Sequence, residues 1–215
     1  MSEEFIREVD EELKEEKAAK LWKKVGPYVI SFAVGIVLFT SGIVGWGNYT
    51  EMSRQQLGDD FSAAVELIKD DDFDSALIAL EEITDKSSDG YVTMAKMKQA
   101  SILIDKKEIE EGLNIYSDLE KTAVDQSFKD MSTILFVINA LDYKSPDLLL
   151  EKIERLTNDN NSWAFSALEL KAYIYVKKGE FNSAKEIFQQ ILDKKSAPST
   201  LAGRARDMVE YLDGN

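Results

Sequence analysis

The sequence predicts an all-α protein, with a single N-terminal transmembrane helix followed by an α-solenoid of paired helices and a C-terminal capping helix. Three observations predict this class. The stretch from Val25 to Thr50 is 26 residues long and carries no charged side chain. After it, small and large apolar residues recur with a period of 35 to 37 residues. No segment shows the sustained alternation of apolar and polar residues that is typical of a strand.

The uncharged stretch is long enough to span a membrane. A helix of this length measures about 39 Å, against about 30 Å for the hydrocarbon core of a bilayer. Five lysines lie within residues 14–24, whereas Arg54 is the only basic residue between the stretch and Lys69. The positive-inside rule therefore places residues 1–24 in the cytoplasm and residues 51–215 across the membrane. Aromatic residues lie near both ends, as in an interfacial belt: Trp22, Tyr28, Trp46 and Tyr49.

A cleaved signal peptide is the alternative to a permanent anchor. Secretory apolar regions are shorter, about 7–15 residues, and end at a small-residue cleavage site. Residues 45–49 read Gly-Trp-Gly-Asn-Tyr, which is a poor match to such a site. The length of the apolar run therefore favours an uncleaved anchor.

Small residues within the stretch suggest a helix–helix contact. Ser31 and Gly35, and then Ser41 and Gly45, are four residues apart, a spacing that lets two membrane helices approach closely. The alternative is the general enrichment of membrane helices in glycine and serine. A homo-oligomer formed through these positions is one reading of the pattern.

The N-terminal residues 2–24 favour an amphipathic cytoplasmic helix. Phe5, Val9 and Leu13 are spaced by four residues and form a narrow apolar stripe, with acidic residues early and basic residues late. Such a helix is either solvated or docks a cytoplasmic partner through Phe5, Ile6, Val9 and Leu13. The predicted organisation is thus residues 1–24, the anchor at residues 25–50 and a repeat domain at residues 51–215.

Charge and composition restrict the function of the repeat domain. Residues 51–215 hold 20 Lys and Arg against 32 Asp and Glu, a net charge of −12. Such a domain is repelled by nucleic acid and by anionic lipid, so we expect protein partners. The chain has no Cys and no His, which excludes thiolate nucleophiles, imidazole bases and Cys/His zinc sites. We predict no enzyme activity, no cofactor and no metal site, and we assign residues 70–72 and 158–161 to helix turns and caps.

The repeat domain contains three ungapped copies of one pattern. A small residue is followed after nine positions by an apolar residue, after twelve by a second small residue, after sixteen by a large residue and after nineteen by another apolar residue. The copies are Ala64, Phe73, Ala76, Leu80, Ile83; then Ala100, Ile109, Gly112, Tyr116, Leu119; then Ala172, Phe181, Ala184, Phe188, Ile191. A weaker copy between them has Val137, Leu149, Ile153 and Leu156, with Pro146 in its turn. Paired small residues let the two helices of a repeat touch, and the larger residues fill the gap to the next repeat.

The repeats predict a binding surface and a cap. Stacked helix pairs form a concave groove that can hold a peptide. Aromatic residues near the repeat helices are candidates for that groove, with core packing as the alternative: Tyr91, Tyr116, Trp163, Phe165 and Tyr173. Residues 199–212 predict a capping helix whose inner face carries Leu201, Ala205, Met208 and Leu212.

The last copy matches the tetratricopeptide signature best. Its signature positions are occupied by Ala172, Tyr175, Gly179, Ala184 and Phe188. The period is also close to the roughly 34 residues of tetratricopeptide repeats. The solenoid is therefore predicted to be tetratricopeptide-like.

The whole layout resembles the YfgM-like ancillary subunits of the SecYEG translocon. The opening run from Phe5 to Leu13 and the entry to the anchor from Gly26 to Ile30 look like those of alphaproteobacterial members. The resemblance implies a single-pass bacterial inner-membrane protein whose periplasmic domain works beside the translocon and periplasmic chaperones. The same domain family includes the cell-division coordinator CpoB.

Two functions follow as hypotheses. The first is an adaptor associated with the Sec translocon and periplasmic chaperones, which binds protein partners or emerging clients. The alternative is a membrane-anchored scaffold that coordinates envelope or cell-division enzymes and self-associates through its anchor.

Overall fold

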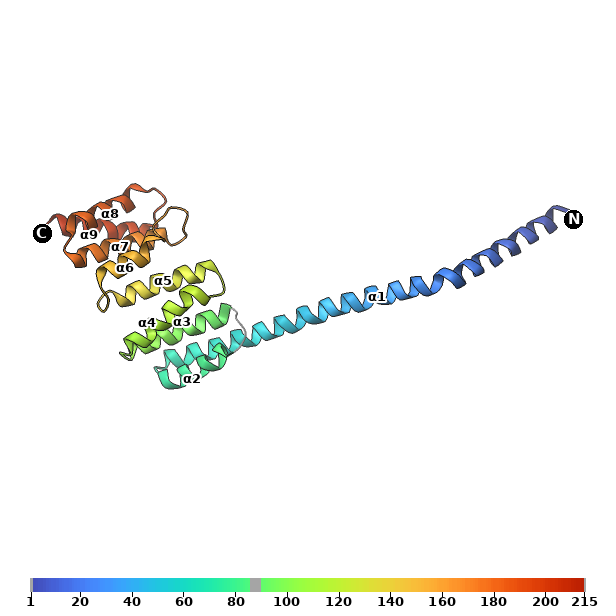
Figure 1. Cartoon of the computed structure of the whole chain (residues 1–215), viewed down its shortest axis with the longest axis horizontal. Coiled ribbons are helices and arrows are strands. Elements are labelled where there is room, and N and C mark those ends of the chain that lie inside the picture. Colours follow the sequence, from blue (N-terminus) through green and yellow to red (C-terminus); the bar gives the residue numbers. More distant parts are fainter. Residues whose placement is uncertain (1, 86–89, 215) are drawn as a thin grey trace. The chain divides into compact units, whose positions relative to one another are not determined.

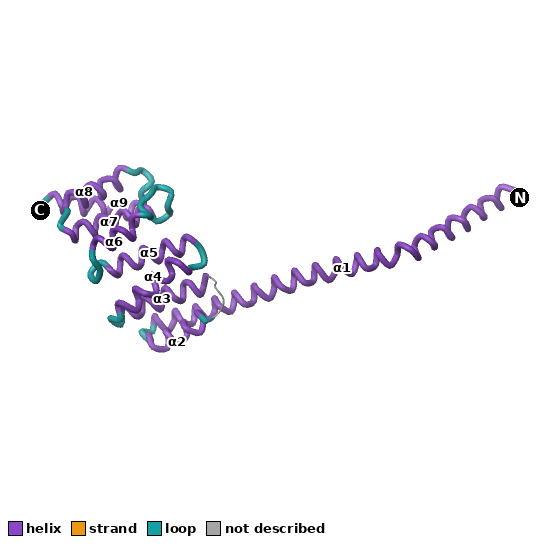
Figure 2. Tube along the Cα trace, in the orientation of Figure 1, coloured by secondary structure: helices purple, strands orange, loops and turns teal. Residues whose placement is uncertain are grey.

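The computed structural model describes the backbone of residues 2–85 and 90–214, which form nine α-helices and no strand (Figure 1, Figure 2). Within these ranges, the side chains of residues 2–16, 18, 29, 30, 33, 45, 47 and 48 are outside the described set. The helices are α1 (Ser2–Lys69), α2 (Phe73–Thr84), α3 (Gly90–Asp105), α4 (Ile109–Thr122), α5 (Gln126–Ala140), α6 (Pro146–Glu154), α7 (Ala164–Lys178), α8 (Phe181–Asp193) and α9 (Ser199–Asp213). The all-α class is confirmed.

The chain divides into two compact units, residues 1–56 and residues 57–215. Helix α1 contributes to both, and its residues 57–69 supply the first helix of the first repeat. In the described residues eight helices follow α1, because the polar residues 51–60 continue α1 into the first repeat. The predicted three-part membrane topology stays a prediction.

The first unit is helical and exposes apolar side chains. Its backbone is helical from Ser2, as predicted for the N-terminal segment, but the side chains of Phe5, Ile6, Val9 and Leu13 are outside the described residues. The described large apolar side chains between residues 21 and 52 are exposed, and Tyr28, Phe32 and Trp46 are each more than 70% exposed. Among the residues that the structure describes, no helix has both the length and the apolar character needed to cross a membrane.

The second unit confirms the repeat pattern in its core. Each first small residue (Ala64, Ala100, Ala172) has no exposed surface, and neither has Val137 at the equivalent place in the third repeat. The partner positions on the second helices are also buried: Ala76, Leu80, Ile83; Gly112, Tyr116, Leu119; Leu149, Ile153, Leu156; Ala184, Phe188, Ile191. Each repeat is therefore one helix pair, packed through the residues that the period predicts.

Three of the four helix pairs share one turn. Asp71, Lys107 and Gly179 each lie seven residues after the first small residue and adopt φ angles of +59°, +73° and +77°. In each turn two backbone N–H groups donate back to the last helical turn, which caps the C-terminus of the first helix. The third repeat has a different turn, in which Ser145 caps α6 and precedes Pro146. A proline restricts the residue before it to an extended conformation, and Ser145 has φ −64° and ψ 141°.

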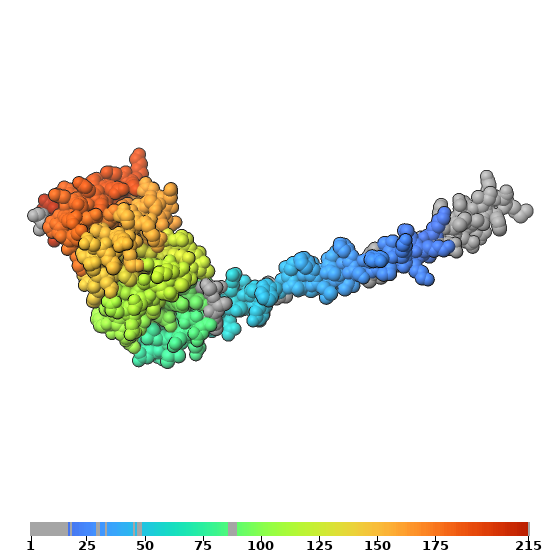
Figure 3. Space-filling view, in the orientation of Figure 1, coloured from blue at the N-terminus to red at the C-terminus, as the bar shows by residue number. Residues whose placement is uncertain are grey.

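The first helices of successive repeats form a continuous layer. Helix α3 contacts α5, α5 contacts α7, and α7 contacts α9. We call α1 residues 57–69, α3, α5, α7 and α9 the first-helix layer, and α2, α4, α6 and α8 the second-helix layer. In the space-filling view the surface of this unit changes colour in chain order, so neighbouring repeats lie side by side (Figure 3). Helix α9 is the predicted cap, since Leu201 and Ala205 are buried against α7 and α8.

Ion pairs connect the repeats at equivalent positions. An acid at the start of α2, α4 and α6 pairs with a lysine at the end of the next repeat's first helix or in the turn after it. The pairs are Asp74–Lys106 at 2.6 Å, Glu110–Lys144 at 2.8 Å and Asp147–Lys178 at 3.0 Å. The hydrogen bond from Lys106 lowers the pKa of Asp74. Because the acids are exposed, we interpret the pairs as fixing the register between repeats more than as a source of stability.

The close approach of α3 and α4 predicts opposite effects for two glycine substitutions. A Cβ on Gly112 would lie 2.7 Å from the backbone oxygen of Ala100, whereas a Cβ on Gly203 in α9 would meet no atom within 4 Å. We expect Gly112→Ala to destabilise the second unit by about 1–3 kcal/mol through overpacking. Gly203→Ala should stabilise it by about 0.5–1 kcal/mol, because alanine favours a helix. Reversible urea unfolding followed by circular dichroism measures both, and equal effects of the two substitutions would contradict the close approach.

Candidate interaction surface

An apolar hollow opens in the first-helix layer across the first three repeats. Its volume is about 370 Å³. It is lined by residues of α1, α3, α4 and α5: Phe61, Met94, Met97, Lys98, Ser101, Tyr116, Met131 and Leu135. All of them belong to the second unit. Three of the eight are methionines, whose flexible and polarisable side chains adapt to differently shaped apolar partners.

Buried side chains form the floor of this hollow. Met97 is 6% exposed and Tyr116 is 2% exposed. The Tyr116 hydroxyl donates a hydrogen bond to the Met97 carbonyl oxygen at 3.3 Å, so its polar atom is already satisfied. Burial, with a smaller contribution from the charge of Asp105, raises the pKa of Tyr116 to about 12. The phenol is therefore neutral at physiological pH and has a packing role.

The rim of the hollow carries a single charge. Lys98 and Ser101 are exposed, while Met94, Met131 and Leu135 are partly exposed. Lys98 has no ion-pair partner within the described residues, and no acidic residue lines the hollow. The hollow is thus locally basic in a chain of net charge −14.

The five aromatic residues predicted for a groove lie in several places. Tyr116 lines the hollow, and Tyr91 packs beside it against Phe61, with ring centroids 6.0 Å apart. Trp163 packs on the core that α3 to α7 share. Phe165 and Tyr173 pack on the core of α7, α8 and α9. Of the five, Tyr116 therefore lines the hollow, Tyr91 contacts the lining residue Phe61, and the other three lie elsewhere.

Two of these aromatics share a repeat position that the sequence analysis missed. Tyr91, Phe128 and Trp163 each lie nine residues before the first small residue of their repeat, and each is partly buried against a core. Their equivalence indicates a packing role at the start of each first helix. The same alignment pairs Met94 with Met131, both of which line the hollow. Aligning the residues that precede the first small residue of each repeat would have paired Met94 with Met131 from sequence alone.

A polar network holds α5, which carries Met131 and Leu135, against the segment that follows α6. The buried Asp130 carboxylate accepts hydrogen bonds from Gln126 at 2.8 Å and from Asn161 at 2.7 Å, and it pairs with Arg155. Arg155 also donates to the Thr133 hydroxyl at 2.7 Å. Burial alone would raise the pKa of Asp130, but hydrogen bonds from Arg155, Asn161 and Gln126 outweigh it and hold the pKa below its ordinary value. Asn161, which we assigned to a turn or cap, thus also bridges to α5, a contact that the sequence analysis did not predict.

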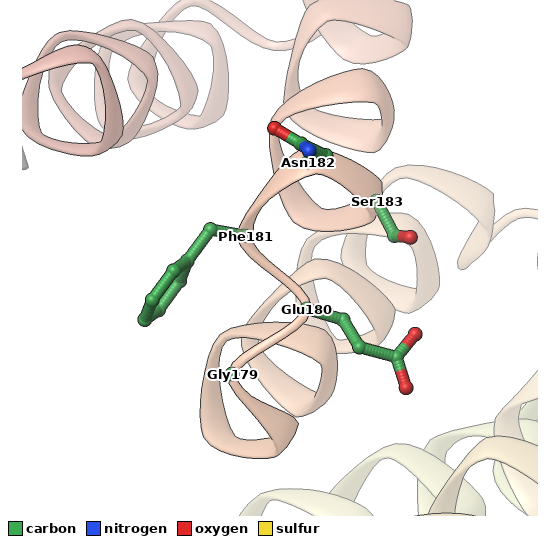
Figure 4. Close-up of a pocket in the computed structure, with 5 residues that line it drawn as sticks. All are labelled: Gly179, Glu180, Phe181, Asn182 and Ser183. Atoms are coloured by element: carbon green, nitrogen blue, oxygen red, sulfur yellow. The ribbon is translucent and has the colours of Figure 1, made fainter.

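A second hollow, of about 360 Å³, lies at the turn between α7 and α8 and is lined by Gly179, Glu180, Phe181, Asn182 and Ser183 (Figure 4). The Phe181 ring points away from the side on which Glu180 and Ser183 lie, and it is 52% exposed (Figure 4). The five residues that line this second hollow are consecutive in sequence, so the hollow is part of a turn surface and is not formed between two separate elements. Within the described ranges, no three acidic side chains converge as a metal site requires.

Comparison with known families identifies the chain. The family model for the tetratricopeptide repeat-like domain matches residues 19–210. The chain belongs to this family. No curated protein and no solved structure matches it. Membership supports a protein–protein interaction role, since tetratricopeptide-like repeat domains are typically non-catalytic scaffolds.

The Asp130 network predicts a pH-dependent contribution to stability. Because the folded pKa of Asp130 lies below its ordinary value of 3.8, its stabilising effect is complete above that pH and is lost as the pH falls through the lowered pKa. At pH 7 we expect Asp130→Asn to cost about 1–3 kcal/mol, since the amide cannot accept all three hydrogen bonds. The difference from the natural chain should shrink below about pH 4 in urea unfolding. The matched control is Asp142→Asn. The Asp142 side chain is 86% exposed and pairs with Lys177, so its loss should cost under about 1 kcal/mol.

Proposed function

We propose that this protein is a membrane-anchored adaptor, whose tetratricopeptide-like unit binds a segment of a partner protein in the hollow of the first-helix layer. The hollow is the observation that carries the proposal. It is apolar, it is open at the surface, and four helices from three consecutive repeats line it. Surfaces of this kind on helical repeats bind extended or helical segments of other proteins.

The proposed anchor is residues 25–50, and the whole sequence of this stretch supports it. Its 26 residues include Val29, Ile30 and Ala33, whose side chains are outside the described set, and none of the 26 is charged. Exposed large apolar side chains in water are unfavourable, by about 25 cal/mol for each Å². Phe32, Leu38 and Phe39 are each about 70% exposed, and lipid would cover them at no such cost. We propose that residues 1–24 are cytoplasmic and that the repeat unit is periplasmic.

The proposed partners are translocon subunits, periplasmic chaperones or emerging clients. Two features support partners of this class. The layout of the chain resembles that of the YfgM-like translocon subunits, and the repeat domain that these share is present here. A net charge of −12 on residues 51–215 also disfavours nucleic acid and anionic lipid as alternatives.

The proposed topology predicts opposite labelling of two single-cysteine variants. The chain has no natural Cys, so Ala19→Cys and Ser196→Cys each provide a single thiol at an exposed position. In intact cells, a membrane-impermeant maleimide admitted to the periplasm should label Cys at position 196 and leave position 19 unlabelled until the cells are lysed. Equal labelling of both before lysis would contradict the topology.

The proposed binding surface predicts site-specific crosslinking. A photoreactive amino acid at Ser101, on the rim of the hollow, should capture a translocon or chaperone subunit in intact membranes. The control position is Asn114, which is exposed on α4 in the second-helix layer and does not line the hollow. Adducts at equal yield from both positions would contradict binding in the hollow. Adducts formed only with a second copy of the chain would contradict the adaptor and favour a self-associating scaffold.

A further inference from the structure

We propose that the hollow binds an apolar helical segment of the partner, and that this segment carries a carboxylate which pairs with Lys98. The inference rests on the proposed function and specifies the chemistry of the bound segment. Three properties of the hollow carry it: its apolar walls, its shortage of backbone-binding groups and its charge.

The walls and volume of the hollow fit apolar side chains. Phe61, Met94, Met131 and Leu135 are partly buried and present apolar surface to the hollow. A volume of about 370 Å³ is near the lower end of the roughly 300–1,000 Å³ typical of ligand pockets. It accommodates a small number of side chains and leaves the rest of the segment outside. An amphipathic helix supplies such anchors at positions i and i+3 or i+4.

The polar groups of the hollow favour a helix over an extended segment. An extended backbone needs hydrogen-bond partners for its N–H and C=O groups when it is covered, whereas a helix satisfies most of these groups internally. The polar side chains that line the hollow are those of Lys98, Ser101 and Tyr116, and the Tyr116 hydroxyl already donates to Met97. Too few groups remain to pair with a strand.

The charge of the hollow favours an acidic segment. Lys98 is the charged residue of the lining and has no ion-pair partner in the described residues, although lysines at the repeat junctions are paired. Asp105 lies near enough to Tyr116 to raise its pKa but does not line the hollow. An apolar segment that covers the hollow removes water from around Lys98, and a carboxylate on that segment offsets this loss. A basic segment would instead meet a like charge.

Three synthetic peptides test the carboxylate. Each is the same 16-residue amphipathic helix with two leucines four residues apart, and the residue beside the second leucine is Glu, Gln or Lys. Fluorescence anisotropy measures their binding to the full chain in phosphatidylcholine nanodiscs, with binding to empty nanodiscs subtracted. We expect the Glu peptide to bind about threefold to fivefold more tightly than the Gln peptide, and the Lys peptide to bind most weakly.

Matched variants make this test specific to the hollow. Lys98→Glu should invert the order, so that the Lys peptide binds best, while Lys121→Glu, an equal charge change at an exposed site on α4, should preserve it. Ser101→Trp should weaken all three peptides by filling the hollow, and Asn114→Trp should not. Unchanged helical content by circular dichroism shows that each variant folds.

The outcomes separate this inference from the proposed function. If Lys98→Glu leaves the order of the three peptide affinities unchanged, the proposed carboxylate–Lys98 pair is wrong. The adaptor function still stands in that case if crosslinks from position 101 persist. A small apolar molecule that co-purifies with the natural chain and is absent from Ser101→Trp overturns the helical occupant. Absence of both peptide binding and crosslinks from position 101 overturns the inference and the proposed function together.

Discussion

The second unit depends on the close approach of paired helix backbones. At Gly112 even a methyl group would collide with the Ala100 carbonyl oxygen, at 2.7 Å. The equivalent pairs Ala64 with Ala76 and Ala172 with Ala184 are fully buried. This close approach fixes the relative position of the two helices, whose contacting residues are twelve positions apart in the sequence. The turn between them must then reverse the chain within a few residues, which explains the shared left-handed residue at Asp71, Lys107 and Gly179.

The third repeat shows what happens when this constraint is relaxed. Val137 and Leu149, both fully buried, replace the two small residues where α5 and α6 pack together. The turn lengthens and begins α6 with Pro146, and α6 is the shortest helix described, with nine residues. The Asp130 network then supplies the contacts that hold α5 against the segment after α6. In this repeat, polar contacts therefore provide part of the packing between elements that small residues provide in the others.

Much of this fold could be predicted from one sequence because its repeats are periodic. The positions of the small and large core residues, the turns and the capping helix α9 all follow from a spacing that recurs. The family model agrees over residues 19–210. Contacts that the period does not specify were beyond prediction: the pairing of Asp130 with Arg155 and Asn161 joins residues 25 and 31 positions apart. Only Tyr116 among the lining residues of the hollow was a candidate, because the candidates were aromatic and four of the eight lining residues are methionine or leucine.

The location of the hollow follows from which side chains fill the space between successive first helices. Between α1 and α3, the Tyr91 ring packs on Phe61 and covers Gly58, where an added Cβ would lie 3.0 Å from the Tyr91 hydroxyl. Between α3 and α5, Phe128 holds the repeat position of Tyr91 and packs on the core, while the unbranched side chains of Met94 and Met131 line the hollow. Both junctions therefore have an aromatic ring at the same repeat position. The hollow opens where methionines of α3 and α5 line the surface.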